Sequence, residues 1–403
     1  MIFVCNFLPD TIRLCMSSLK IYYIANARMP TERAHGIQLA KMCEAFLDRG
    51  ISLELVVPRR ATAQKLIASF YGLRREIPIT KLWVMDTYLY GRMGYVVGSL
   101  SFAVAYFCYF LVKRIRGERF LIYTTDIDQF SFFLIPFIGV PYFAEIHDAK
   151  AKKFPFTHFF SRARGLIVIN NIIKEKLCVR FGIEPARIIV HPNGIDLITF
   201  HREYVLLDAR KKLGLPQDKK IVLYIGKFYD WKGLDTLIDA ADLLKEYITL
   251  LFYFVGDTEE NLKKVTKRAT LPPSIRCVSH RDLKEIPLWL SAANVCVALG
   301  TKKSEYSYYH TSPMKLFEYM AISGYAIIAA ETSAMKEIVS DDHVVFYRPD
   351  DAGDLAKKIT ECIGGGHNFE EKSRKAFERV RGFTWEKRAS SIVAFIEHRL
   401  LCV

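Results

Sequence analysis

A short segment in the last third of the chain combines a potential anion site with a carboxylate. Ser312 is a preferred helix N-cap and Pro313 a preferred first helical residue, which predicts a helix starting there. The free N–H groups of such a first turn, which holds Met314 and Lys315, bind anions. Glu318 lies roughly 8 Å farther along the axis, where a carboxylate can accept both hydroxyls of a ribose. The spacing suits a nucleoside diphosphate, although an ordinary capped surface helix has the same pattern.

Two lysines occupy a second segment, Gly226-Lys227-Phe228-Tyr229-Asp230-Trp231-Lys232-Gly233, which follows a short apolar run. Two cations in a loop between a strand and a helix can neutralise one diphosphate and help it to leave. The spacing of a P-loop is absent. The alternative is a solvated loop.

A histidine follows a strand-like run in Glu145-Ile146-His147-Asp148. At the carboxyl end of a strand, His147 can bind a sugar hydroxyl or take a proton. A purely structural histidine is the alternative.

The elements that must position these residues repeat a strand–helix pattern, which predicts parallel sheets. Helical stripes are exemplified by Leu39, Cys43 and Phe46. We expect an α/β chain of two doubly wound Rossmann-like domains facing a cleft, 17–200 (with part of 385–403) and 201–384, with a charged junction near 197–218. The expected strands are 20–25, 51–57, 120–123, 142–146 and 165–169, then 221–225, 251–255, 275–278 and 294–298.

The composition is that of a globular protein, with 51% hydrophobic and 25% charged residues. Nine dispersed cysteines form no paired zinc motif and no disulfide framework, which favours a reducing cytoplasm. The apolar start 1–14 lacks the charge pattern of a signal peptide, and a start at Met16 is simpler. The net charge of +14 suits phosphate-bearing ligands or anionic lipid. No motif supports nucleic acid as a partner.

Residues 95–112 carry no charge and are followed by Lys113, Arg114 and Arg116. This length is at the lower edge for a membrane span, and a span would split the first domain. Between Val56 and Phe120 there are eleven basic and three acidic residues. The segment therefore predicts either an interfacial helix on an anionic membrane or a solvated basic face over a buried helix.

Taken together and in order, these motifs resemble those of the family-4 retaining glycosyltransferases of the GT-B fold, from about Lys20 onward. The match consists of the strand-end His147, the linker entry His191-Pro192-Asn193-Gly194-Ile195-Asp196, Gly226-Lys227 with Lys232-Gly233, Glu318-Tyr319-Met320-Ala321, and Phe383-Thr384-Trp385-Glu386. The segments Met29-Pro30-Thr31-Glu32-Arg33-Ala34-His35-Gly36 and 312–318 are similar to those of a bacterial surface-polysaccharide subgroup.

The resemblance implies that Lys227 and Lys232 bind the donor diphosphate, Glu318 its ribose and His147 the transferred sugar. It further implies transfer with retained configuration, no metal, no cofactor beyond the nucleotide-sugar co-substrate, and a final helix at 385–401 that crosses back to the first domain. We expect a glycan or polyprenyl-linked acceptor, and a cytoplasmic protein that is peripheral on the inner membrane face in the interfacial alternative.

Two positions depart from the family pattern. His310 stands where the family has a glutamate that faces the donor sugar. Arg33 and Ala34 stand where paired glycines are common, which makes Arg33 and His35 candidate contacts for a charged acceptor.

Three rival functions remain open. Asp126-Ile127-Asp128 has the D-x-D form that holds a metal in GT-A glycosyltransferases. An epimerase on the same fold would consume a nucleotide sugar without an acceptor. A non-catalytic protein that binds nucleotide sugars is consistent with His310.

Overall fold

The computed structural model describes residues 19–31, 33–60, 66–125, 128–150, 154–200 and 204–401. The chain divides into two compact units, of which unit 1 is Met1–Pro192 with Trp385–Val403 and unit 2 is Asn193–Thr384. The boundary at Pro192 precedes the junction expected at 197–218, because Phe200 and Ala209 belong to the core of unit 2. The segment 1–14 and the alternative start at Met16 lie outside the described residues.

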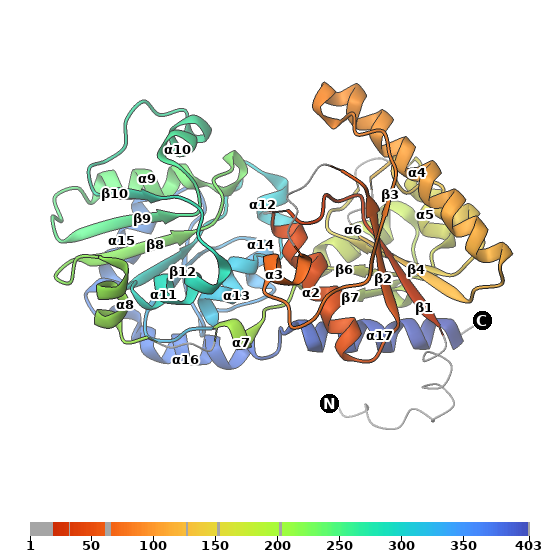
Figure 1. The fold of residues 1–403 in the computed structure, drawn as a ribbon. Helices are drawn as coiled ribbons and strands as arrows, with labels where there is room; N and C mark the ends of the chain where they lie inside the picture. The colour runs from red at the N-terminus through yellow and green to blue at the C-terminus, as the bar shows by residue number, and fades with distance from the viewer. Residues whose placement is uncertain are drawn as a thin grey trace. The chain divides into compact units, whose positions relative to one another are not determined.

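Unit 1 is built on a parallel sheet of seven strands in the order β3-β2-β1-β4-β5-β6-β7. Its first six positions have the order of dinucleotide-binding folds. The central strands are buried on both faces because helices cover each side, as Figure 1 shows. The strands are β1 (Lys20–Ile24), β2 (Leu53–Pro58), β3 (Ile79–Leu82), β4 (Phe120–Thr125), β5 (Tyr142–Ile146), β6 (Gly165–Val168) and β7 (Ile188–Val190).

The helices of unit 1 include one that the chain forms only after leaving unit 2. This is the last helix, α17, which packs on α2 and so confirms the expected crossing back to the first domain. The helices are α2 (Ala34–Asp48), α3 (Ile67–Tyr71), η1 (Tyr88–Tyr90), α4 (Gly91–Ile115), η2 (Ile135–Phe137), α5 (Phe156–Arg162), α6 (Asn171–Phe181), η3 (Pro185–Arg187) and α17 (Trp385–Leu401).

Unit 2 repeats the same architecture with six parallel strands in the order β10-β9-β8-β11-β12-β13. The strands are β8 (Lys220–Ile225), β9 (Leu250–Val255), β10 (Ile275–Val278), β11 (Val295–Ala298), β12 (Ala326–Ala330) and β13 (Val345–Tyr347). The helices are α7 (Leu197–Phe200), α8 (Leu206–Leu213), η4 (Asp230–Lys232), α9 (Leu234–Leu243), α10 (Glu259–Thr266), η5 (Leu283–Glu285), α11 (Ile286–Ser291), α12 (Glu305–Tyr309), α13 (Met314–Met320), α14 (Ser333–Lys336), α15 (Ala352–Ile363), η6 (Gly366–Asn368) and α16 (Phe369–Val380). Two doubly wound α/β units confirm the expected fold class.

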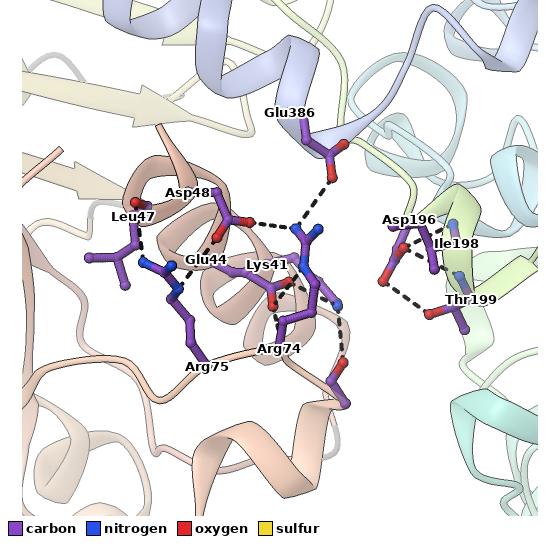
Figure 2. Close-up of polar contacts among 11 residues, drawn as sticks. Lys41, Glu44, Leu47, Asp48, Arg74, Arg75, Asp196, Ile198, Thr199 and Glu386 are labelled. Carbon is purple, nitrogen blue, oxygen red and sulfur yellow. Dashed lines mark hydrogen bonds and ion pairs between the residues drawn. The ribbon is translucent and has the colours of Figure 1, made fainter. Parts of the chain in front are cut away.

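The two ends of unit 2 lie next to each other in the fold. Ile195 pairs with Thr384 in a parallel bridge, and the Ile195 N–H donates to the Phe383 carbonyl at 2.9 Å. Asp196 then caps the start of α7, accepting the N–H groups of Ile198 and Thr199 at 3.1 and 3.3 Å (Figure 2). The aspartate of the linker motif thus has a local structural role.

A polar network joins α2 to α17 and to the loop after α3 within unit 1 (Figure 2). Lys41 and Glu44 form a buried ion pair, with Nζ 3.1 Å from Oε2. The exposed guanidinium of Arg74 pairs with Asp48 and lies 3.6 Å from a Glu386 carboxylate oxygen. The Lys41–Glu44 pair is therefore shielded from solvent, whereas the pairs of Arg74 with Asp48 and Glu386 lie at the surface.

Candidate functional site

The loop after β8 brings Lys232 back to the carboxyl end of that strand. Gly233 has φ +75°, and a Cβ there would lie 3.0 Å from the Gly300 carbonyl oxygen, so the turn needs glycine. A Cβ placed on Gly226 would lie 3.2 Å from Lys232 Nζ. The ammonium group therefore lies over Gly226, where parallel α/β sheets bind their ligands.

Lys232 forms no direct ion pair in the parts of the chain that the structure describes. Its Nζ makes neither a hydrogen bond nor an ion pair there, and it lies 5.6 and 5.4 Å from the ring centroids of Tyr229 and Trp231. Burial, with a smaller contribution from Lys315, lowers the pKa of Lys232 to about 8, although Glu318 opposes this shift. Burial thus destabilises the protonated form of Lys232, and a bound anion would stabilise it.

The helix that carries Glu318 begins later than the sequence predicts. Helix α13 starts at Met314, and Pro313 occupies the N-cap position without a side-chain cap. The prediction that Ser312 caps this helix is therefore wrong. Its hydroxyl oxygen instead accepts the N–H of Asn193 at 2.8 Å, and this contact with a distant segment replaces the local cap. Met314 is half-buried in the first turn.

Lys315 and Glu318 bind each other on α13. Nζ of Lys315 lies 2.6 Å from Oε2 of Glu318, and the Glu318 side chain is buried. Both residues act electrostatically on Lys232, so the three charges form one cluster. The cluster holds two ammonium groups against one carboxylate and can accept a further negative charge.

Two more predicted donor residues lie in unit 2. Lys227 follows Gly226 directly and is half-buried. His310 is the C-cap residue that follows α12 and is buried, with Nε2 3.9 Å from a carboxylate oxygen of Glu305. The family pattern has a glutamate at this position. Here the position is a histidine, and the nearby acidic side chain is Glu305.

His147 belongs to unit 1 and follows β5. Its Nε2 lies 2.6 Å from Oε1 of Glu145. Although burial would raise the pKa of Glu145, Arg388, His147 and Tyr123 hold it well below its usual range. The ionised carboxylate accepts only, so Nε2 of His147 carries the proton and donates. This bond fixes the tautomer and the orientation of the ring.

Three side chains that the sequence analysis did not select complete this network. Tyr123 Oη and Gln38 Nε2 each donate to Glu145 at 2.6 Å, and Arg388 of α17 pairs with it at 2.8 Å. A sequence signal was available, because a glutamate inside the apolar strand 142–146 requires buried partners. The identity of those partners depends on the tertiary fold.

The two candidate acceptor residues lie at the start of α2, in unit 1. Arg33 precedes the helix and is exposed, and His35 is half-buried in the first turn. Gln38 follows within the next turn and binds Glu145 beside His147. The structure therefore links the start of α2 to the histidine network.

The rival metal motif falls largely on undescribed positions. Asp126 and Ile127 lie outside the described residues, and Asp128 accepts the N–H groups of Phe130 and Ser131 at 2.7 and 2.8 Å. Among the residues that the structure describes, no group of three or more His, Cys, Asp or Glu is placed to hold a metal ion.

Comparison with known proteins gives consistent matches for both sequence and fold. The family model "Glycosyl transferases group 1" matches residues 207–379. D-inositol 3-phosphate glycosyltransferase of Nocardioides sp. is 27% identical over 252 residues, 56% of this chain and 52% of the relative. The putative colanic acid biosynthesis glycosyl transferase WcaI of Escherichia coli is 28% identical over 154 residues, 37% of each chain. The chain thus spans about half the length, or less, of these curated relatives.

The solved structures extend the likeness to both units. Anabaena Alr3699/HepE, solved in complex with UDP and glucose, has a TM-score of 0.69 at 16% identity and covers 94% of this chain and 100% of its own. Unit 2 contains the whole segment matched by the family model. The chain therefore has the GT-B fold, and the segment 207–379 of its second unit matches the family model of the group 1 glycosyltransferases.

Proposed function

We propose that this protein is a retaining glycosyltransferase that moves a sugar from a nucleotide-diphosphate donor to a glycan or lipid-linked acceptor in cell-surface polysaccharide synthesis. The observation that carries the proposal is Lys232. It is a half-buried ammonium group at the carboxyl end of β8 with a lowered pKa and no direct ion pair among the described residues, in a cluster of two lysines against one glutamate. A diphosphate would supply the missing negative charge.

The neighbouring residues suit the rest of a nucleotide. In our proposal Lys227 joins Lys232 on the diphosphate, together with Ser312, Met314 and Lys315 around the start of α13. Glu318 has a buried carboxylate that pairs with Lys315. In the donor complex this carboxylate would also accept hydrogen bonds from the ribose hydroxyls. His310 would contact the donor sugar. The complex of Alr3699/HepE with UDP and glucose makes UDP-sugars the first donors to test.

Unit 1 would supply the acceptor side and one contact to the transferred sugar. His147, oriented by Glu145, has a fixed tautomer that suits a hydrogen bond to a sugar hydroxyl. Arg33 and His35 would bind a charged acceptor such as a lipid-linked diphosphate sugar. We further propose that the lysines take the place of a metal, with no other cofactor, and that the protein works in the cytoplasm on the inner face of a membrane.

The decisive experiment combines binding with transfer. The chain is screened by thermal unfolding with a panel of nucleotide sugars, and the stabilising donor is then supplied with membrane lipid extract and a chelator. A donor at a hundred times its Kd adds about 2.7 kcal/mol. We expect transfer with retained anomeric configuration in the chelator, read by NMR of the product.

Matched variants connect the result to the site. Glu318→Ala removes the carboxylate that would accept the ribose hydroxyls, whereas Glu378→Ala removes only the exposed pair with Arg374. We expect the first to lose donor stabilisation and transfer, and the second to retain both. Transfer that stops in the chelator contradicts metal independence, and consumption of the donor without any acceptor indicates an epimerase.

A further inference from the structure

Helix α4 exposes one continuous apolar stripe along its whole length. Residues 93–112 carry no charge. The buried face of the helix packs on the unit 1 core through Phe102, Tyr106 and Phe110. The opposite face is exposed at three- and four-residue spacing, through Met93, Val97, Leu100, Val104, Cys108, Leu111 and Ile115. At 1.5 Å per residue the stripe is about 33 Å long. It is therefore a contiguous apolar patch and not a set of scattered surface hydrophobics.

The segment before α4 also exposes large side chains, and its 3-10 helix η1 packs on α4. Trp83, Leu89 and Tyr90 are 73%, 91% and 78% exposed, respectively. Tryptophan and tyrosine concentrate where an apolar phase meets water, because each has an apolar ring with a polar group. We call Trp83, Leu89 and Tyr90 together with the exposed face of α4 the α4 surface. Figure 1 shows α4 along the outer side of unit 1.

The fold is inconsistent with α4 as a membrane span. The helix is long and apolar enough to cross a bilayer, and a third of its most apolar window is buried. However, β3 before it and β4 after it are strands of one sheet. A span would place these two strands on opposite sides of a bilayer. An apolar helix face that cannot cross a membrane can still lie on one.

The charges at the two ends of α4 select the partner. Arg92 lies in its first turn, and Arg116 and Arg119 follow its last turn, all exposed and without an ion pair to any described residue. Glu118 is already paired with Lys113. A second copy docked by the same stripe would bring arginine against arginine in either orientation. An anionic lipid surface complements both ends.

We propose that the α4 surface docks unit 1 on a membrane rich in anionic lipid, with α4 lying in the plane of the headgroups. Its apolar stripe would enter the acyl boundary, Trp83 and Tyr90 would lie at the headgroup level, and Arg92, Arg116 and Arg119 would bind lipid phosphates. Only the role of the docking, which is to bring the enzyme to a lipid-linked acceptor, rests on the proposed function.

Vesicle flotation of the full chain tests this docking directly. Vesicles of phosphatidylcholine alone are compared with vesicles that also contain phosphatidylglycerol, at low and high salt. We expect binding to the anionic vesicles, weakened by salt. The double variant Leu100→Glu/Val104→Glu places two carboxylates in the stripe and should weaken binding by at least about tenfold. Arg116→Gln should weaken it by roughly fivefold.

The control variant introduces the same chemistry elsewhere. Val179→Glu alters an exposed valine on α6, in the same unit, and should bind vesicles like the unchanged chain. Folding of every variant is checked by thermal unfolding.

Three outcomes overturn the docking. The first is vesicle binding that Leu100→Glu/Val104→Glu leaves unchanged, and the second is an unchanged chain that does not bind vesicles. The third is a dimer in sedimentation that the double variant dissociates without any vesicle binding, which would identify a second copy as the partner. Stabilisation by nucleotide sugar is measured in parallel. If nucleotide sugars do not stabilise the unchanged chain, the donor site is refuted and the docking result still stands. If vesicles are not bound although a nucleotide sugar stabilises the chain, the docking is refuted and the donor site still stands.

Discussion

Arg388 of α17 and Glu145 of β5 form a fully buried ion pair, with Nη2 of the guanidinium 2.8 Å from Oε1 of the carboxylate. The two residues are 243 positions apart in the chain. Nε of Arg388 also donates to the Pro192 carbonyl, at the last residue of unit 1 before the chain enters unit 2. One side chain thus joins the sheet, the returning helix and the exit from unit 1.

Breaking this pair should be costly, and removing it entirely much less so. We expect Arg388→Met to destabilise unit 1 by about 3–5 kcal/mol, because it leaves the Glu145 carboxylate buried without a counter-ion. The double variant Glu145→Met/Arg388→Met should recover most of that loss in urea unfolding. Its transfer activity should stay low, since His147 has lost the carboxylate that orients it. A double variant no more stable than the single one would refute this account.

Lys232 should be a residue that lowers the stability of the free protein. Lys232→Met removes a poorly solvated charge, and we expect it to raise the free energy of unfolding by on the order of 2 kcal/mol at neutral pH. The same variant should lose stabilisation by the donor. Both effects can be read in one thermal scan with and without nucleotide sugar. Lys219→Met, which removes a lysine bonded to the Ile248 carbonyl at the surface, is the control.

The lowered pKa of Lys232 predicts two dependences on pH. Unfolding restores the pKa from about 8 to its ordinary 10.5, so the unfolded chain binds more protons and stability rises with pH between these values. Donor affinity changes in the opposite direction, because the diphosphate binds the protonated lysine. We expect Kd to rise about tenfold from pH 7 to pH 9. Lys232→Arg keeps its charge throughout and should bind with little change over this range. An unchanged pH profile in that variant would assign the titration to another group.

The network of Figure 2 predicts a contrast between two glutamates. Glu44→Gln removes the carboxylate charge from the buried ion pair with Lys41 and should cost about 3–5 kcal/mol. Glu386→Gln breaks only a 3.6 Å contact with the exposed Arg74 and should cost under about 1 kcal/mol. Unfolding midpoints in urea separate the two. Equal losses would mean that the Lys41 pair is hydrated.

Much of the fold could be predicted from the sequence because its central strands are apolar on both faces. Strands β5 and β10 have the expected bounds, β2 differs at both ends, and the others that were expected differ by one or two residues at one end. The missed strands are short or small-residue segments, namely β3, β7, β12 and β13. β12, Ala326–Ala330, consists of alanine and isoleucine, which suit a helix as well as a strand.

The candidate site was predictable where a residue acts with its neighbours in the chain, and not where a distant residue intervenes. Lys315 and Glu318 stand three residues apart, a spacing that favours an ion pair on a helix. Ser312 has the right type for a cap, but its hydroxyl is occupied by Asn193, 119 positions away. Arg388 could not be assigned to Glu145 without the tertiary structure, because no pattern links α17 to β5.

The return of the chain to unit 1 affects the order in which the protein can be completed on the ribosome. Unit 2 is one continuous stretch whose ends meet at Ile195 and Thr384, so it can fold as soon as that stretch has emerged. Unit 1 must wait until α17 has been translated. Throughout the synthesis of unit 2, the carboxylate of Glu145 lacks its guanidinium partner. We therefore expect unit 1 to complete its fold only after unit 2 has been synthesised and Arg388 has emerged.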